Sequence, residues 1–580
     1  MKFLDAAASL ERFLGDPADP QARICQRRQL ALDEEERFPQ QAVDAIEAWG
    51  LHSFYVPVRL GGRLQRVDEL LHVLRAVSRR DLTVAIGHAV TLLGAAPVWA
   101  QGSATTQARC AELILDGQPV SLALTEVEHG SDLVANECRL EPAADGGFRL
   151  HGEKWLINNA TRCVALTVHA NLAGVQGARA ATLVWVEKDH IGPARYACLP
   201  KEPTSGIRGA DISGIRFDGA ELGETAVIGA RGAGLEITLC SLQVTRTLCC
   251  GLSIGAGDTA VRTIFGFMQG RRLYGAALHE HAQARHLLAR TFALQLVAES
   301  VALTAARLVH VAPSEMSVVA SVAKYFVPAT VETLFDAAES LLGARAYLRE
   351  TPFAGFQKAK RDQQLVSLFE GNSIISLQFI ALQLRQLAQR TLAMLERPGE
   401  QVELHQRAQR LFDLSHELDG LDFAGLALSG RGHDLVMQFS SCTLMRTPGF
   451  AAVDERLRGC MQRWAQVHRE LLHGVTVTMA GAQAGDPAWF DAARRYCSLY
   501  AAAAVFGLWY FNRDSEALPF DPVFRRGTWL PDVLGELVDG EAADFGAAPT
   551  GLYEWLERLV GGHLAVSILP YPCPNSVVTE

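Results

Sequence analysis

Residues 360–378 read KRDQQLVSLFEGNSIISLQ, and the carboxylate of Glu370 stands near the centre of this stretch. Two apolar pairs, at 365–366 and 368–369, come just before it, and Gly371 follows it directly. Apolar flanks predict that the carboxylate is buried, and burial raises the pKa of an acid. Glycine lets the backbone approach a neighbouring group closely. Glu370 is therefore the first candidate for a catalytic residue; the plainer alternative is a helix-terminal carboxylate on a solvated face.

The chain on both sides of this stretch has a mainly helical pattern. Residues 236–390 and 391–580 contain long segments with apolar residues three and four positions apart, and residues 1–118 share this period. Residues 119–235 instead show short alternating or apolar runs separated by Gly, Asp, Pro and Asn, which is typical of strands. The sequence therefore predicts an α+β fold: an N-terminal helical domain (1–118), a central antiparallel β domain of barrel or sandwich form (119–235), a helical-bundle domain (236–390) and an additional C-terminal helical domain (391–580).

Composition narrows the class of protein. The chain has 580 residues, of which 49% are hydrophobic and 20% charged, as is ordinary for a soluble globular protein of about three to five domains. A net charge of -10 argues against a nucleic-acid surface, because phosphate binding needs clustered Lys and Arg. The 12 cysteines show no CxxC spacing, so neither a disulfide framework nor a metal site is predicted. Reduced thiols predict a cytoplasmic location.

Membrane insertion is not favoured by the sequence pattern. Asp5 and Glu11 interrupt the apolar residues of the N-terminus, where a signal peptide needs an unbroken apolar run. The longest apolar run, YAAAAVFGLWYF at 500–511, is too short to span a bilayer and predicts a buried helix. No strongly basic amphipathic stretch indicates surface binding to a membrane.

Two further stretches and one pair of arginines are candidates for contacts with a ligand. Residues 121–132 read SLALTEVEHGSD, in which Gly130 and Ser131 allow a phosphate to approach backbone N–H groups. Residues 152–160 read GEKWLINNA. Arg246 and Arg271 lie 25 residues apart, and a guanidinium is a good partner for a diphosphate. The stretch GARGAGL at 229–235 is not followed by a βαβ pattern, so a Rossmann fold is not indicated.

Taken in this order, the motifs resemble those of the acyl-CoA dehydrogenase family. TEVEHGSD resembles the family's TEPxxGSD, GEKWLINNA resembles GxKxWITN, RRLYG resembles RxxFG, and KRDQQLVSLFEG resembles RDxxxxxxYEG. The resemblance covers about residues 30–390. It implies an N-terminal helical domain, a central antiparallel β domain, a C-terminal four-helix bundle and FAD as the cofactor.

The resemblance also implies roles for individual residues. Glu370 corresponds to the base that removes the α-proton of an acyl thioester, while flavin N5 accepts the β-hydride, and its backbone N–H would help to hold the thioester oxygen. Cofactor contacts fall on Leu124, Thr125, Gly130, Ser131, Leu156, Ile157, Asn158, Arg271, Ser340, Gly343 and Asn372, of which Arg271, Ser340 and Gly343 would reach the FAD of a neighbouring subunit. Substrate contacts fall on Ser131, Gln243, Arg246 and Gly371.

Several positions depart from the family pattern. Leu156 takes the place of the usual Trp, Asn158 stands where Thr usually hydrogen-bonds flavin N5, and Gln243 replaces the usual Asp. An amide can also donate a hydrogen bond, so Asn158 can keep that role. The remaining departures are Val127 for Pro, Phe369 for Tyr, Asn372 for Thr, and Ser340 with Gly343 and Ala344 where the family has Gln and a Gly pair.

The region after residue 390 leaves alternatives open. Very-long-chain acyl-CoA dehydrogenases and acyl-CoA oxidases carry such an extension, which implies a homodimer. The electron acceptor would be an electron-transfer flavoprotein, or O2 in an acyl-CoA oxidase. The departures at Leu156, Asn158 and Gln243 leave room for an acyl group carried on a carrier protein. An alternative of another class is a non-catalytic scaffold that keeps the fold. Chain length and branching of the acyl group do not follow from the sequence.

Overall fold

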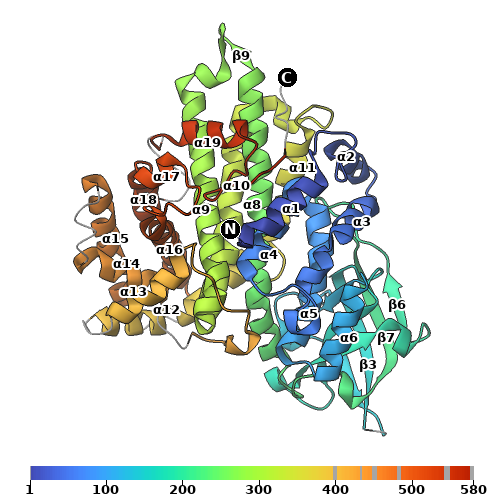
Figure 1. Cartoon of the computed structure of the whole chain (residues 1–580). Coiled ribbons are helices and arrows are strands. Elements are labelled where there is room, and N and C mark those ends of the chain that lie inside the picture. Colours follow the sequence, from blue (N-terminus) through green and yellow to red (C-terminus); the bar gives the residue numbers. More distant parts are fainter. Residues whose placement is uncertain are drawn as a thin grey trace.

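The N-terminal helices lie against one end of the β domain and against the long helices that follow it (Figure 1). The computed structural model describes residues 2–144, 146–395, 401–430, 434–446, 454–479, 485–540 and 549–574. The first helices are α1 (Lys2–Leu14), α2 (Gln26–Glu34), α3 (Gln40–Trp49), α4 (Val67–Arg80), α5 (Leu82–Gln101) and α6 (Ala104–Leu115). Asp81 begins α5, where its side chain accepts a hydrogen bond from the backbone N–H of Val84 at 3.1 Å. Such a cap satisfies an otherwise unpaired donor at the helix start.

The central domain is one mostly antiparallel sheet. Its strands are β1 (Val120–Ala123), β2 (Arg139–Pro142), β3 (Phe148–Asn158), β4 (Ala165–Leu172), β5 (Ala181–Glu187), β6 (Tyr196–Leu199), β7 (Ile212–Leu222) and β8 (Val227–Ile228). The order is β6-β7-β3-β2-β4-β5-β8, with β1 beside β4; the β1–β4 and β2–β4 pairs are parallel. The register of β3 against β7 shifts between Trp155 and Ile157, and Leu156 there has a φ of 53°. A bulge of this kind redirects a side chain.

A bundle of long helices follows the sheet. It contains α8 (Gly234–Gly270), α9 (Ala282–Val311), α10 (Met316–Leu342) and α12 (Ser373–Leu395), with the short α11 (Ala354–Gln363) packed beside α8. The short hairpin β9 (Arg272–Leu273) and β10 (Ala276–Ala277) joins α8 to α9. The fold class predicted from the sequence is confirmed: helices, sheet, helical bundle and further helices occur in that order (Figure 1).

In the part of the chain that the structure describes, four helical stretches are long and apolar enough to cross a membrane, judged by length and composition alone. They are Leu82–Gln101, Gly234–Gly270, Ala282–Val311 and Pro313–Tyr347. Within their most apolar windows, between 78% and 100% of the residues are buried inside the protein. Their apolar surface therefore forms the interior of the bundle and its contact with α4 and α5.

The C-terminal extension adds a second helical layer on the side of the bundle away from the sheet (Figure 1). Its helices are α13 (Gln401–Phe412), α14 (Leu435–Arg446), α15 (Glu455–His473), α16 (Pro487–Asn512), α17 (Pro522–Arg526), α18 (Leu530–Asp539) and α19 (Leu552–Gly561). Helix α16 carries the apolar run 500–511 and packs against α9, α12, α14 and α18. Residues 500–509 of that run are buried, as the sequence predicted.

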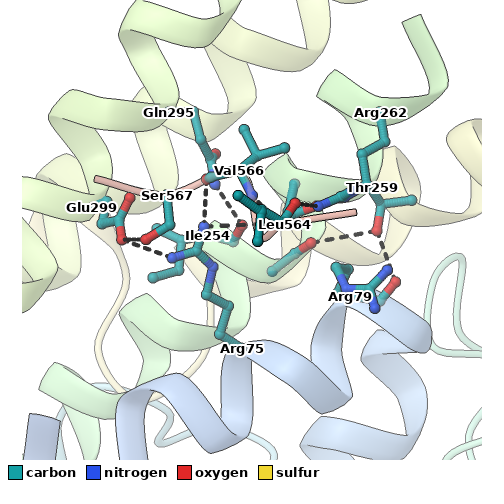
Figure 2. Close-up of polar contacts among 12 residues, drawn as sticks. Arg75, Arg79, Ile254, Thr259, Arg262, Gln295, Glu299, Leu564, Val566 and Ser567 are labelled. Carbon is teal, nitrogen blue, oxygen red and sulfur yellow. Dashed lines mark hydrogen bonds and ion pairs between the residues drawn. The ribbon is translucent and has the colours of Figure 1, made fainter. Parts of the chain in front are cut away.

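The chain then turns back into the core. Residues 563–574, called here the C-terminal strap, form a loop that folds back on itself, with Leu564 bridged to Pro572. Val566 and Ser567 at its turn have no exposed surface. The strap lies between α4, α8 and α9, where charged side chains from these helices bind its backbone (Figure 2). The end of the C-terminal extension thereby contacts the N-terminal helices, through Arg75 of α4.

Candidate functional site

A cavity of about 820 Å³ lies where the sheet, α5, α8 and the start of α12 meet. Its walls are mostly apolar: α5 contributes Ile86, Ala89 and Val90, and α8 contributes Leu248 and Leu252. Polar side chains come from the turn after β1, from the end of β3, from the segment before β7, from α8 and from residues 361–372. An apolar cavity with a few convergent polar groups is the usual form of a cofactor or substrate site.

Glu370 lies on a strained turn in the wall of this cavity. The short helix η9 (Gln364–Ser367) ends just before it, and Glu370 and Gly371 have φ values of 55° and 89°. A non-glycine residue in this left-handed region costs about 1–3 kcal/mol and persists only where its surroundings enforce it. Asn372 starts α12, and its side chain accepts a hydrogen bond from the N–H of Ile375 at 3.0 Å. We call residues 366–372 the base loop.

The environment of the Glu370 carboxyl group combines burial with incomplete pairing. Burial raises the pKa of Glu370, while the charge of Lys324, contacts with Thr245 and Cys249, and the charge of Arg246 act against that rise. Its Oε2 is buried and has no hydrogen-bond partner among the described residues. A carboxylate with a raised pKa and a free oxygen can accept a proton from a weak acid held in the cavity.

Two cations contact the base loop from different helices. Arg246 of α8 donates from Nε to the carbonyl oxygen of Glu370 at 2.8 Å. Lys324 of α10 donates from Nζ to the carbonyl oxygen of Val366 at 2.6 Å and lies 3.4 Å from that of Gly371. A Cβ at position 371 would lie 2.8 Å from Nη2 of Arg246, so only glycine fits there without displacing the guanidinium.

The turn after β1 is held by a buried ion pair. Lys154 of β3 donates to Oε1 of Glu126 at 2.8 Å and to the carbonyl oxygen of Leu124 at 3.0 Å. The Glu126 carboxylate also accepts from the backbone N–H groups of residues 137 and 138. Thr125 and Trp155 exchange hydrogen bonds at 2.6 and 3.0 Å. The absence of the usual proline at Val127 is therefore compensated, because three partners hold the neighbouring carboxylate.

The residues around Asn158 fit a flavin ring. Its Oδ1 is buried without a partner among the described residues, while Nδ2 donates weakly to the carbonyl oxygen of Ile86 at 3.4 Å. An unpaired buried amide oxygen is costly unless a ligand supplies a donor. Apolar walls suit a planar ring system, and a Cβ at Gly130 would meet only open space. FAD would be held by Leu124, Thr125, Gly130, Ser131, Leu156, Ile157, Asn158 and Asn372 of this chain.

Most residues predicted from the sequence line this one cavity: Leu124, Thr125, Gly130, Ser131, Leu156, Ile157, Asn158, Arg246, Glu370, Gly371 and Asn372. Gln243 does not line it; its amide donates to the carbonyl oxygen of Ala427 in the extension at 2.8 Å. Arg271 follows the last residue of α8, Ser340 lies exposed near the end of α10, and Gly343 follows α10. These three lie outside the cavity, and their contact with a neighbouring subunit's FAD stays a prediction.

The sequence motifs missed three residues around the base. Thr245 and Cys249 of α8 contact the Glu370 carboxyl group, and Lys324 lies behind it. Lys324 is a lone charge in the apolar stretch SVVASVAKYFVPAT at 317–330, which is a usable signal of a buried cation. Thr245 and Cys249 carry no comparable signal, because small polar residues are common inside helices.

Comparisons with known proteins agree with this geometry. Residues 121–220 match the family model described as acyl-CoA dehydrogenase, middle domain, and residues 232–384 match acyl-CoA dehydrogenase, C-terminal domain. The probable acyl-CoA dehydrogenase FadE25 of Mycobacterium tuberculosis is 26% identical over 350 residues, which cover 59% of this chain and 87% of that protein.

Two solved structures have the same fold. The acyl-CoA dehydrogenase complexed with FAD from Bacillus anthracis has a TM-score of 0.71 at 18% identity and covers 92% of this chain and 85% of its own. The prolyl acyl carrier protein oxidase AnaB has a TM-score of 0.59 at 19% identity and covers 66% of this chain and 98% of its own. The first match extends well beyond the family core, so the C-terminal helices also have a counterpart of known fold. On these matches and motifs, the chain carries the middle and C-terminal domains of the acyl-CoA dehydrogenase family, and FAD is the cofactor that these domains bind.

Proposed function

We propose that this protein catalyses the FAD-dependent α,β-dehydrogenation of an acyl thioester such as an acyl-CoA, with Glu370 as the base that removes the α-proton. The observation that carries the proposal is that Glu370 lines a cavity of about 820 Å³ and that its buried Oε2 has no hydrogen-bond partner among the described residues. Coarser support comes from the family itself, whose named members are acyl-CoA dehydrogenases.

The protein's part in the reaction follows from the groups around Glu370. The α-proton of a thioester is weakly acidic, so its removal needs a positioned base and a stabilised enolate oxygen. Glu370 supplies the base, and we infer that its backbone N–H helps to hold the thioester oxygen. The apolar walls exclude water from the reacting carbons, which strengthens both interactions. FAD, when bound, supplies the acceptor for the β-hydride.

Anaerobic visible spectroscopy of the purified protein tests this function. We expect a bound-flavin spectrum that bleaches on addition of a suitable acyl-CoA from a panel of straight and branched esters. A protein that binds no flavin, even after FAD is added, would contradict the proposal and favour a scaffold. Flavin that no thioester bleaches would refute the assigned reaction while leaving the cofactor assignment intact.

A carrier-protein thioester is the second candidate substrate. The amide of Gln243, at a position where the resemblance implies substrate contact, is engaged by the carbonyl oxygen of Ala427 in the extension. The extension therefore alters a contact that a CoA ester would use. Bleaching by an acyl-carrier protein, but not by the matching acyl-CoA, would select this candidate.

The electron acceptor, the assembly and the location stay proposals from the sequence. We propose an electron-transfer flavoprotein as acceptor, with O2 as the oxidase alternative, a homodimer as the assembly, and the cytoplasm as the location. Release of hydrogen peroxide during turnover in air would identify the oxidase alternative. Sedimentation of the holoenzyme would test the homodimer.

A further inference from the structure

Lys324 is a buried cation close to the cavity. It lies in the middle of α10, and its side chain is 1% exposed. Among the residues that the structure describes, no carboxylate lies within ion-pair distance of it. Its contacts are the carbonyl oxygens of Val366 and Gly371 and the ring of Phe369, whose centroid is 5.1 Å from Nζ. A buried charge without a counterion is costly, so its retention calls for a role.

The contacts of Lys324 span the base loop. Val366 precedes Glu370 by four residues and Gly371 follows it, so one ammonium group bridges the two sides of the strained turn. Arg246 binds the carbonyl oxygen between them, that of Glu370, from the opposite helix. Three carbonyl groups of one short loop are thereby held by two cations. Left-handed backbone at two consecutive positions needs such external support.

The charge of Lys324 also acts on the base itself. Burial raises the pKa of Glu370, and four neighbouring groups lower it. The charge of Lys324 has the largest lowering effect, ahead of Thr245, Arg246 and Cys249. The charged and titratable groups of α8 that face this region include Arg246, Cys249 and Cys250, and those of α10 are Lys324 and Glu332. Glu332 accepts a hydrogen bond from Ser367. Lys324 therefore combines a geometric contact with an electrostatic one.

We propose that Lys324 is a positioning residue for the reaction: it holds the base loop through the carbonyl groups of Val366 and Gly371, and its charge stabilises the ionised form of Glu370. This proposal rests on the proposed function, in which Glu370 is the base. Lys324 does not line the cavity, so it acts through the loop and not on the substrate.

Three variants of the FAD-loaded protein separate the two effects. Lys324→Gln keeps N–H donors for the carbonyl groups but removes the charge, and Lys324→Met removes both. Ser367→Ala is the matched control, because it removes another contact between α10 and the same loop without removing a cation. Removing a nearby positive charge raises the pKa of a carboxyl group. As the pH falls, the carboxylate is then protonated, and inactive as a base, at a higher pH than before.

The measurement is the rate of flavin reduction against pH, together with 13C NMR titration of labelled glutamate side chains, in which Glu370→Gln identifies the Glu370 signal. For both Lys324 variants we expect the acidic limb of the rate and the Glu370 titration to move up by about one pH unit or more. Hydrogen exchange of residues 366–372 should rise in Lys324→Met and less in Lys324→Gln. Ser367→Ala should leave the titration where it is in the unaltered protein.

Lys324 variants whose Glu370 titration matches that of Ser367→Ala would overturn the proposal, even where activity falls. The NMR titration needs no turnover, so it stays decisive if no acyl thioester reduces the flavin. In that case the proposed function fails separately from the role of Lys324. If Lys324→Met does not fold, Lys324→Gln carries the same test of the charge.

Discussion

Two of the regions that hold buried charges, the strap and the base loop, differ in how those charges are paired. Around the C-terminal strap, Arg75 donates to Glu299 at 2.8 Å and to the carbonyl oxygen of Val566 at 2.6 Å (Figure 2). Glu299 also accepts from Ser567 and from the N–H of Ile568. Around the base loop, and among the residues that the structure describes, one oxygen of Glu370 has no hydrogen-bond partner and Lys324 has no carboxylate within ion-pair distance. Charges are matched in the first region and left partly unmatched in the second.

The buried charges of the strap region stabilise the fold, whereas those of the base loop serve the proposed chemistry. In the strap region, two helices present carboxylates to backbone N–H groups of the strap, and two present arginines to its carbonyl oxygens. Paired groups of opposite charge stabilise one arrangement, although Nε of Arg75 and Nη1 of Arg262 have no hydrogen-bond partner among the described residues. In the base loop, incomplete pairing leaves a carboxylate free to take a proton, at a cost in stability.

Replacing the base should give the largest effect. We expect Glu370→Gln to retain FAD and to slow flavin reduction by about 10²–10⁴-fold, the usual contribution of a general base. Because burial raises the pKa of Glu370, the neutral amide should not lower the free energy of unfolding. Stopped-flow reduction and chemical denaturation measure the two quantities. Retention of more than about a tenth of the rate, a barrier change below ~1.4 kcal/mol, would refute the assignment of the base.

Breaking the strap network should instead reduce stability. Glu299→Ala removes the nearer carboxylate partner of buried Arg75 and leaves only Asp258, at 3.8 Å. Removing one partner of a buried ion pair costs about 3–5 kcal/mol in unfolding free energy. Urea denaturation measures this loss, while the rate of flavin reduction per bound FAD should stay close to that of the unaltered protein. The double variant Arg75→Met/Glu299→Leu is the control and should recover part of the stability. A stable Glu299→Ala protein would show that the strap contacts contribute little.

The buried carboxylate of Glu11 in α1 pairs with Arg79 and Arg80 of α4, and this pairing makes the stability of the protein depend on pH in a predictable way. Burial alone would raise the pKa of Glu11, but Arg79 and Arg80 outweigh it and lower the pKa to about 2. A lowered pKa in the folded state contributes stability that is present above about pH 4.5 and lost as pH falls toward 2. The shift corresponds to about 3 kcal/mol at neutral pH.

Denaturation of the protein and of Glu11→Gln across this pH range measures the contribution. The difference in unfolding free energy between the two should shrink as pH falls from about 4.5 to about 2. A difference that is constant over this range would contradict the pairing of Glu11 with the two arginines. Glu370, whose pKa is raised, should show the opposite sign: its ionised form lowers stability as pH rises.

The smallest expected effect concerns the start of α12. Asn372→Ala removes the hydrogen bond from the N–H of Ile375 and should cost about 1 kcal/mol of stability, as for other helix caps. Asn372→Ser keeps a capping oxygen and should restore most of the loss. If the serine variant is no more stable than the alanine variant, the side chain of Asn372 does not act as a cap. Flavin content of both variants would show whether the residue also contacts FAD.

Local sequence predicted much of the candidate site because its motifs are short. SLALTEVEHGSD and KRDQQLVSLFEG each place several cavity residues within one turn or loop, so their relative positions follow from local geometry. The position of Gln243 could not be predicted in the same way. Gln243 is engaged by Ala427, 184 positions later in the chain, and no local pattern predicts such a contact. The parallel pairing of β1 with β4 could not be predicted either, because the alternation of apolar and polar residues does not show which strands pair or in which direction.

The amino-acid sequence alone determined the order of helical and strand segments, the family resemblance and the identity of Glu370 as the candidate base, because periodicity and motif spacing are local properties of a chain. Only the tertiary structure decided which charges surround that base. Lys324, Thr245 and Cys249 lie between 46 and 125 positions from it, as their residue numbers show, and come together through the packing of α8 and α10 against the base loop. Tertiary structure likewise placed the strap beneath α4, since long-range contacts depend on how whole helices pack and not on the residues beside each other in sequence.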